Sequence, residues 1–141
     1  MNRNMVLAKW NRAREALRAA GTLTRNHCYA DAISRAYYAI LHAAKAALHV
    51  HAVAAESHAA VRRLFGLHLV KPGEIETKWS ALLVESLDDR LAADYDVETS
   101  FSAEEARNEC HTSREFLSRV KRYLLKHGLK EAELRKRQRG G

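Results

Sequence analysis

The chain contains very little proline and glycine. Pro72 is the single proline, and the six glycines in 141 residues include three that stand where helices would end, Gly21, Gly73 and Gly128. Because proline interrupts helices and glycine weakens them, this scarcity favours a few long helices. No segment alternates apolar and polar residues for long enough to indicate a sheet. The sequence therefore predicts an all-α fold, an up-and-down bundle of four to five helices.

Long apolar runs and cysteine pairs are also missing. No run of roughly eighteen apolar residues occurs, and charged residues interrupt the N-terminal segment where a signal peptide would need an apolar stretch. We therefore expect a soluble, cytoplasmic protein. The spacing of the two cysteines, Cys28 and Cys110, resembles neither a disulfide framework nor a zinc site. We expect both thiols to be reduced.

Apolar residues repeat at helical spacing in five segments. Ser57 stands where it can cap the third, and Ser102 with Glu105 has the spacing of a capping box at the start of the fifth. Glycine at position 21 predicts the end of the first helix. The periodicity of this helix predicts an outward face that carries Arg12, Arg14 and Arg18. The expected helices span residues 4–20, 27–49, 57–70, 75–94 or 77–94, and 102–126.

Positive charge gathers at the C-terminal end. Of the net charge of +7, residues 126–141 carry +4, from six basic and two acidic residues. We predict one helical domain over residues 1–126 and a flexible basic tail over residues 127–141. The tail suits phosphate binding through counterion release, although a solvated terminus would explain the same charges.

The second predicted helix combines many alanines with a polar stripe. Eight alanines within residues 30–47 favour helix and allow neighbouring helices to pack closely. Four polar residues share one helix face at spacings of four, three and four, namely Asp31, Arg35, Tyr38 and His42. Arg35 and His42, about 10 Å apart on that face, form one candidate catalytic pair for a phosphate ligand. In the alternative, structural interpretation, Arg35 pairs with Asp31 and His42 packs beside Tyr38.

Three segments in order carry a resemblance to a known family. They read SRAYYAILHAAKAAL at residues 34–48, SHAAVRRLFGLHLVKPGEI at residues 57–75 and LDDRLAADYD at residues 87–96, and the helix start SAEEA follows them. Together they resemble the HEPN domain family (higher eukaryotes and prokaryotes nucleotide-binding), in particular its short stand-alone bacterial and archaeal members. The resemblance spans residues 9–125.

This resemblance implies a four- or five-helix bundle, commonly a homodimer, often encoded beside a minimal nucleotidyltransferase partner. Active members of the family are metal-independent ribonucleases that serve as toxins or in defence, so the resemblance implies no cofactor and no metal. Their site is an arginine followed, after four to six residues, by a histidine. Arg90 and Tyr95 stand at the corresponding positions here. Because tyrosine has a pKa near 10, it is a poor general base at neutral pH.

The resemblance assigns roles to several residues. Arg90 and Tyr95 would be catalytic, with Arg35 or His42 assisting them across a dimer cleft. A nucleotide or RNA would be bound by Arg35, Tyr38, Arg90 and Asp94, and we expect Arg35 and Tyr38 to contact the fourth helix. Tyr95 also resembles the tyrosine that the nucleotidyltransferase modifies with AMP in some toxins of the family.

Other polar pairs favour structural explanations. Arg107 and His111 are one turn apart, and we interpret them as an exposed helix pair. His49, His51 and His58 lie close in sequence, but no nearby cysteines or carboxylates complete a zinc site of usual spacing. No phosphate-binding glycine loop or serine-centred elbow is present, so common kinases and hydrolases have no support.

Three functions remain. The preferred one is a non-catalytic helical partner that binds a nucleotide, RNA or a nucleotidyltransferase in a toxin–antitoxin or defence-type module. The first alternative is a metal-independent endoribonuclease toxin that uses Arg90 and Tyr95. The second alternative is a structural dimerisation module.

Overall fold

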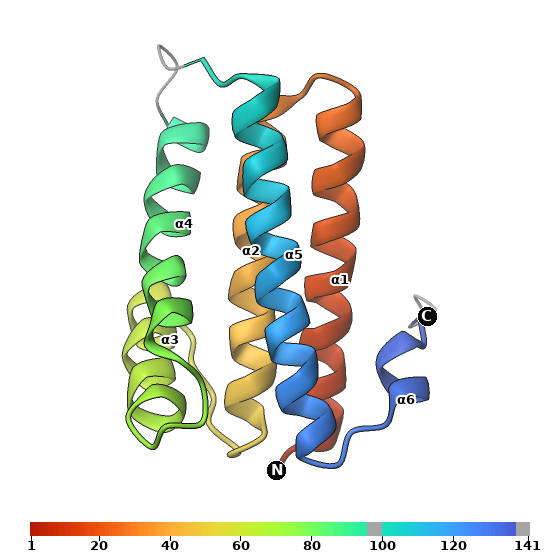
Figure 1. Cartoon of the computed structure of the whole chain (residues 1–141), viewed down its shortest axis with the longest axis vertical. Helices are drawn as coiled ribbons and strands as arrows, with labels where there is room; N and C mark the ends of the chain where they lie inside the picture. The colour runs from red at the N-terminus through yellow and green to blue at the C-terminus, as the bar shows by residue number, and fades with distance from the viewer. Residues whose placement is uncertain (96–99, 138–141) are drawn as a thin grey trace.

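A computed structural model shows an all-helical bundle (Figure 1), as the sequence predicts. It describes residues 1–95 and 100–137, with four residues of α4 described by their backbone alone, Asp88, Asp89, Ala92 and Tyr95. The helices are α1 (Arg3–Arg25), α2 (Tyr29–His49), α3 (His58–Phe65), the π-helical turn η1 (Gly66–Val70), α4 (Thr77–Tyr95), α5 (Ala103–Lys126) and α6 (Glu131–Arg135). Among the described residues, no helix is long and apolar enough to cross a membrane.

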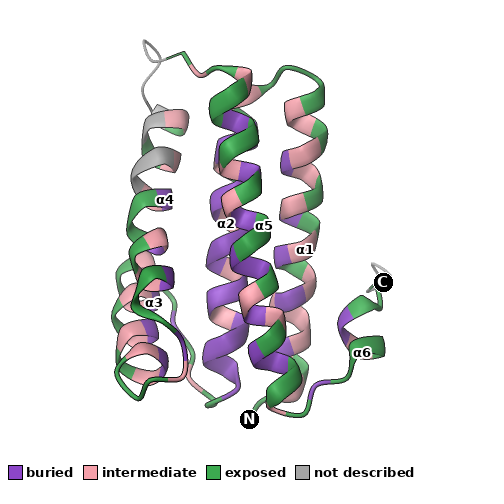
Figure 2. Ribbon diagram, in the orientation of Figure 1, coloured by how far each residue is buried: buried purple, intermediate pink, exposed green. Residues whose placement is uncertain are grey.

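The alanine-rich helix α2 is the central element. It packs against α1, α4 and α5, and most of its surface is buried (Figure 2). Ala36, Ala39 and Ala43 are completely buried. Because these side chains are small, α1 and α5 can both approach α2 closely.

Aromatic side chains close the end of the core between α3, α4 and α5. The Phe116 ring lies 6.0 Å from the ring of Phe65 and 6.0 Å from the ring of Trp79, measured between centroids. Burying a side chain of this size contributes about 1.5–3 kcal/mol. This cluster fixes α4 against the bundle and so positions the polar residues that α4 carries further along.

Helix α1 is longer than predicted. We expected it to stop at Ala20 because Gly21 follows, but α1 continues to Arg25. Leu23 packs against the buried cluster of Ala32, Ile33 and Ala106, and the Thr24 hydroxyl donates a hydrogen bond to the Ala20 carbonyl at 2.8 Å. These contacts outweigh the roughly 1 kcal/mol that glycine costs in a helix.

Other helix boundaries agree with the capping signals. The Ser57 hydroxyl accepts a hydrogen bond from the Ala60 amide, and Ser102 and Glu105 form the expected capping box. The third helix reaches Val70 as expected, although its last turn, η1, is π-helical. Both cysteine thiols are free, Cys28 exposed and Cys110 buried.

The segment after α5 differs from the expected flexible tail. Residues Glu131–Arg135 form α6, whose Leu134 is buried. The Trp10 indole and the Arg14 guanidinium both donate hydrogen bonds to the Leu134 carbonyl, at 3.0 and 2.7 Å. Arg3 pairs with Glu133. Helix α6 is therefore tied to α1, and residues 138–141, with Arg139, lie outside the described residues.

Candidate functional site

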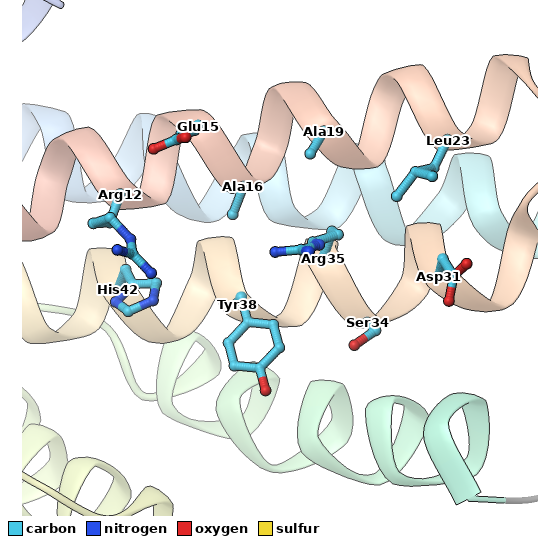
Figure 3. Close-up of a pocket in the computed structure, with 10 residues that line it drawn as sticks. All are labelled: Arg12, Glu15, Ala16, Ala19, Leu23, Asp31, Ser34, Arg35, Tyr38 and His42. Carbon is cyan, nitrogen blue, oxygen red and sulfur yellow. The ribbon is translucent and has the colours of Figure 1, made fainter. Parts of the chain in front are cut away.

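An open groove runs between α1 and α2 (Figure 3). Its volume is about 930 Å³. Helix α2 buries its other faces against α4 and α5. On the α1 side of the groove, Ala16 and Ala19 have small side chains that leave the space open. All four residues of the predicted polar stripe line the groove, together with Ser34 and, from α1, Arg12, Glu15, Ala16, Ala19 and Leu23.

Arg35 occupies the middle of this groove. Figure 3 shows its side chain in the space between α1 and α2. The residue is exposed, and within the described part of the chain it forms neither a hydrogen bond nor an ion pair. The expected pairing with Asp31 is therefore absent, and so is the expected contact of Arg35 with α4. Its guanidinium remains available to a ligand.

Tyr38 makes the contact with α4 that we expected. The Arg90 Nη2 donates a hydrogen bond to the Tyr38 hydroxyl at 2.9 Å, and the Arg90 guanidinium lies 5.3 Å from the Tyr38 ring centroid. Arg90 also pairs with Asp94, one turn along α4, with 2.9 Å between Nε and Oδ2. Only 13% of the Arg90 side chain is exposed. Arg90 is thus bound within the protein, in contrast to Arg35.

A second aromatic residue, Tyr37, also contacts Arg90 and was not among the predicted site residues. The Tyr37 ring centroid lies 5.8 Å from the Arg90 guanidinium, and the Tyr37 hydroxyl hydrogen-bonds to Nδ1 of His58. Burial raises the pKa of Tyr37 to about 12, so the phenol is neutral at neutral pH. The rings of both adjacent tyrosines therefore lie near Arg90 of α4.

Tyr95 is the last residue of α4, and its side chain lies outside the described residues. The structure therefore shows the partners of Arg90 but not the arrangement of Arg90 with Tyr95. The assignments of Tyr95 as a catalytic residue and as an AMP acceptor stay predictions.

His42 lies at one end of the groove beside Arg12 (Figure 3). Its ring stacks on that of Tyr38, with 6.3 Å between centroids and 23° between planes, as the structural alternative expected. Burial, followed by the charges of Lys45, Arg12 and Lys9, lowers the pKa of His42 to about 4. The Nδ1 atom is buried and has no hydrogen-bond partner in the described structure. At neutral pH this imidazole is uncharged and is a poor proton donor or acceptor for catalysis.

The contribution of α1 to the groove was missed. The periodicity of α1 placed Arg12, Arg14 and Arg18 on an outward face, but Arg12 lines the groove and Arg14 reaches α6. An outward face cannot be distinguished from a groove wall until the neighbouring helix is placed. Lys9, three residues before Arg12, acts electrostatically on the same histidine.

The three histidines weighed as zinc ligands, His49, His51 and His58, have separate surroundings, and His51 instead lies beside His68 and His127, with ring centroids 6.4 and 6.1 Å away. His49 is buried, His58 contacts Tyr37, and the His51 Nε2 lies 2.6 Å from the Tyr123 hydroxyl. Among the described residues no three His, Cys, Asp or Glu side chains are grouped as metal ligands. On α5, Arg107 and His111 are both exposed, and His111 pairs with Glu115.

Comparisons with known proteins agree with this architecture. A family model described as HEPN domain matches residues 7–123. A Methanocaldococcus jannaschii protein named "Putative toxin MJ0605" is 38% identical over 112 residues, which cover 79% of this chain and 83% of that protein. A second protein of that organism, "Putative toxin MJ0142", is 28% identical over 122 residues, 86% of this chain and 83% of its own length. A Pyrococcus horikoshii protein, "UPF0332 protein PH1297", is 42% identical over 76 residues, 54% of each chain.

The HEPN family model covers residues 7–123, which are most of the chain. The chain therefore belongs to the HEPN domain family.

Proposed function

We propose that this HEPN-domain protein is the helical partner of a toxin–antitoxin or defence-type module, and that its α1–α2 groove binds a nucleotide or RNA without cleaving it. The observation that carries the proposal is the state of Arg35. This arginine lies in an open groove of about 930 Å³ and has no protein partner in the described structure. Arginine binds phosphate through charge-assisted, often bidentate hydrogen bonds, so an available guanidinium in a groove suits a phosphorylated ligand.

The low pKa of His42 and the protein partners of Arg90 favour ligand binding over RNA cleavage. Metal-independent RNA cleavage needs a base for the ribose 2′-hydroxyl and an acid for the leaving oxygen. His42, whose pKa lies near 4, is poorly matched to either role at neutral pH. Arg90, which the family resemblance makes catalytic, is held by Tyr38 and Asp94. We therefore place ligand binding on Arg35 and Tyr38, and assign Arg90 and Asp94 to holding Tyr38.

The family comparisons support the toxin-type context. Two relatives that match along most of their lengths carry the word toxin in their names. We propose by analogy that this chain works beside a nucleotidyltransferase, inside the cytoplasm, and as a homodimer. A pull-down with the purified chain from its native lysate should recover a nucleotidyltransferase, and the neighbouring reading frame should encode it. A lysate that yields no such protein would contradict the partner role.

A labelled single-stranded RNA tests binding and cleavage in one sample. We expect fluorescence anisotropy to rise with protein concentration while a denaturing gel shows the RNA intact. Arg35→Gln should raise Kd about tenfold, because one charge-assisted hydrogen-bonding group is lost. Arg18→Gln removes the same charge from an exposed position of α1 outside the groove and serves as the matched control.

The ribonuclease alternative makes the opposite prediction. If the RNA is cut, and Arg90→Ala abolishes the cutting without unfolding the chain, the non-catalytic role is wrong. If Arg90→Ala and the parent chain are equally harmless in cells and neither cuts RNA, the ribonuclease alternative is excluded.

A further inference from the structure

Several cations gather at the His42 end of the groove, from two helices that run antiparallel. Helix α1 contributes Lys9 and Arg12, three residues apart, and α2 contributes Lys45, three residues after His42. Within the described residues none of the three forms a hydrogen bond or an ion pair. Elsewhere on the bundle, cations such as Arg3, Arg119 and Lys121 pair with carboxylates.

The antiparallel register of the two helices brings these cations to the same end, because the Asn2 amide donates a hydrogen bond to the His49 carbonyl at 3.0 Å and so places the start of α1 beside the end of α2. The pKa of Lys45 is lowered, first by burial and then by Lys9. The pKa of His49 is lowered by burial and by the same two lysines. Holding like charges together in a partly buried position costs free energy unless an anion compensates them.

Nearby carboxylates neutralise only part of the positive charge at the His42 end of the groove. Glu56 acts on Lys45 and His49, and Glu15 lines the groove on the α1 side. Neither forms an ion pair with the three cations in the described structure. Three cations against two carboxylates leave an excess of positive charge beside the unpartnered Nδ1 of His42.

We propose that Lys9, Arg12 and Lys45, with the imidazole of His42, form a phosphate subsite at this end of the groove. This assignment rests on the proposed ligand-binding function and specifies how the ligand is oriented. The phosphate group, from a free nucleotide or from RNA, lies against the cations. The rest of the ligand extends along α2 past Tyr38 and Arg35 toward Ser34 and Asp31, where the groove carries less positive charge.

The four side chains offer complementary chemistry to a phosphate. Arg12 supplies a planar set of donors, and the lysines supply compact charges. A phosphate monoester carries a charge of roughly −1.5 to −2 at neutral pH, which would more than neutralise this excess of one positive charge. The neutral imidazole of His42, which lines the groove, has one N–H to donate.

The test measures the affinity of four probes for the full chain by calorimetry. The probes are AMP, adenosine, and one RNA octamer with either a 5′-phosphate or a 5′-hydroxyl. We expect Arg12→Gln and Lys45→Gln each to weaken binding of the phosphate-bearing probes at least about tenfold. Arg18→Gln, an exposed position of α1 outside the groove, should change it by less than about twofold. Equal thermal stability of the variants confirms that each one folds.

The probes also identify the source of the phosphate. Tight binding of AMP with weak binding of adenosine indicates a free nucleotide. A preference for the 5′-phosphorylated octamer indicates an RNA end, and equal affinity for both octamers indicates the RNA backbone. Each of these results supports the subsite if Arg12→Gln and Lys45→Gln weaken binding of the same probe.

Two results overturn the assignment and are distinguishable. If ligands bind and Arg35→Gln weakens them, but Arg12→Gln and Lys45→Gln behave like Arg18→Gln, the groove binds ligand without this phosphate subsite. If none of the probes binds the parent chain, the subsite and the proposed ligand-binding function both fail.

Discussion

Arg35 and Arg90 differ in their exposure and in their protein partners. Arg90 is held by the Tyr38 hydroxyl and the Asp94 carboxylate and is almost covered, whereas Arg35 is exposed and without a described partner. A guanidinium that already donates to protein acceptors has fewer N–H groups left for a ligand. This difference is the reason that we propose Arg35, rather than Arg90 at the position of the family's motif, as the ligand-binding arginine.

Removing the Tyr38 hydroxyl tests the structural role of Arg90. Tyr38→Phe should lower the free energy of unfolding by about 1 kcal/mol, because a part-buried hydrogen bond to a charged group is lost. Urea denaturation monitored by circular dichroism measures this change. Tyr29→Phe, whose hydroxyl contacts the exposed His27, should cost less than about 0.5 kcal/mol. Equal costs for both variants would contradict the role given to Tyr38.

The titration of His42 provides a second test at this scale. In the unfolded chain its pKa is near 6.5, and in the folded chain it is about 4. Between these values the unfolded chain binds more protons, so this residue lowers the stability of the fold as pH falls from 6.5 to 4. Nuclear magnetic resonance of the imidazole signals should show a midpoint near pH 4. A midpoint near 6.5 would mean that the ring is not buried beside Arg12.

Sequence predicted the residues of the stripe but only some of their partners. The spacing of Asp31, Arg35, Tyr38 and His42 is a local property of one helix, and the groove contains all four. The partners depend on neighbouring helices. The sequence did not indicate that Arg35 would face α1 rather than α4, and of the two expected contacts with α4 the structure shows only that of Tyr38.

At the scale of elements, local signals predicted the helices and tertiary contacts decided their ends. Alanine content and the Ser102 capping box placed α2 and α5 correctly. Gly21 was a misleading stop signal, since the packing of Leu23 extends α1. Helix α6 was missed because five residues offer too little periodicity, and its stability comes from contacts with α1.

The docking of α6 can be tested with one core substitution. Leu134 is 1% exposed, so Leu134→Ala should lower the free energy of unfolding by about 2–4 kcal/mol. Lys136→Ala, two residues further along and exposed, should change it by less than about 0.5 kcal/mol. Chemical denaturation of both variants measures the difference. A neutral Leu134→Ala would show that the segment after α5 is not part of the folded unit.

At the scale of the whole molecule, the open face of α2 is the distinctive feature. Helices α1, α3, α4 and α5 all pack against α2, but the polar stripe of α2 lines the open groove. Helix α6 lies beyond the residues that the HEPN family model matches, 7–123, and packs on the far end of α1 from the α1–α2 turn. The groove therefore stays accessible when the C-terminal segment is docked.

The proposed homodimer predicts a mass in solution of about twice the 16.0 kDa of one chain. The family resemblance supports this assembly. Analytical ultracentrifugation at micromolar concentration measures the mass directly. A single species at the mass of one chain would contradict the dimer while leaving the groove intact.

Chemical-shift mapping with a phosphate-bearing ligand tests the central claim most directly. AMP or a short single-stranded RNA is titrated into isotopically labelled protein, and the amide and imidazole signals are followed. The account predicts that the largest shifts fall along the groove, at Arg12, Arg35, Tyr38 and His42, while the RNA stays intact. Shifts confined to another surface, such as the exposed face of α5 around Arg107 and His111, or no shifts at all, would contradict it.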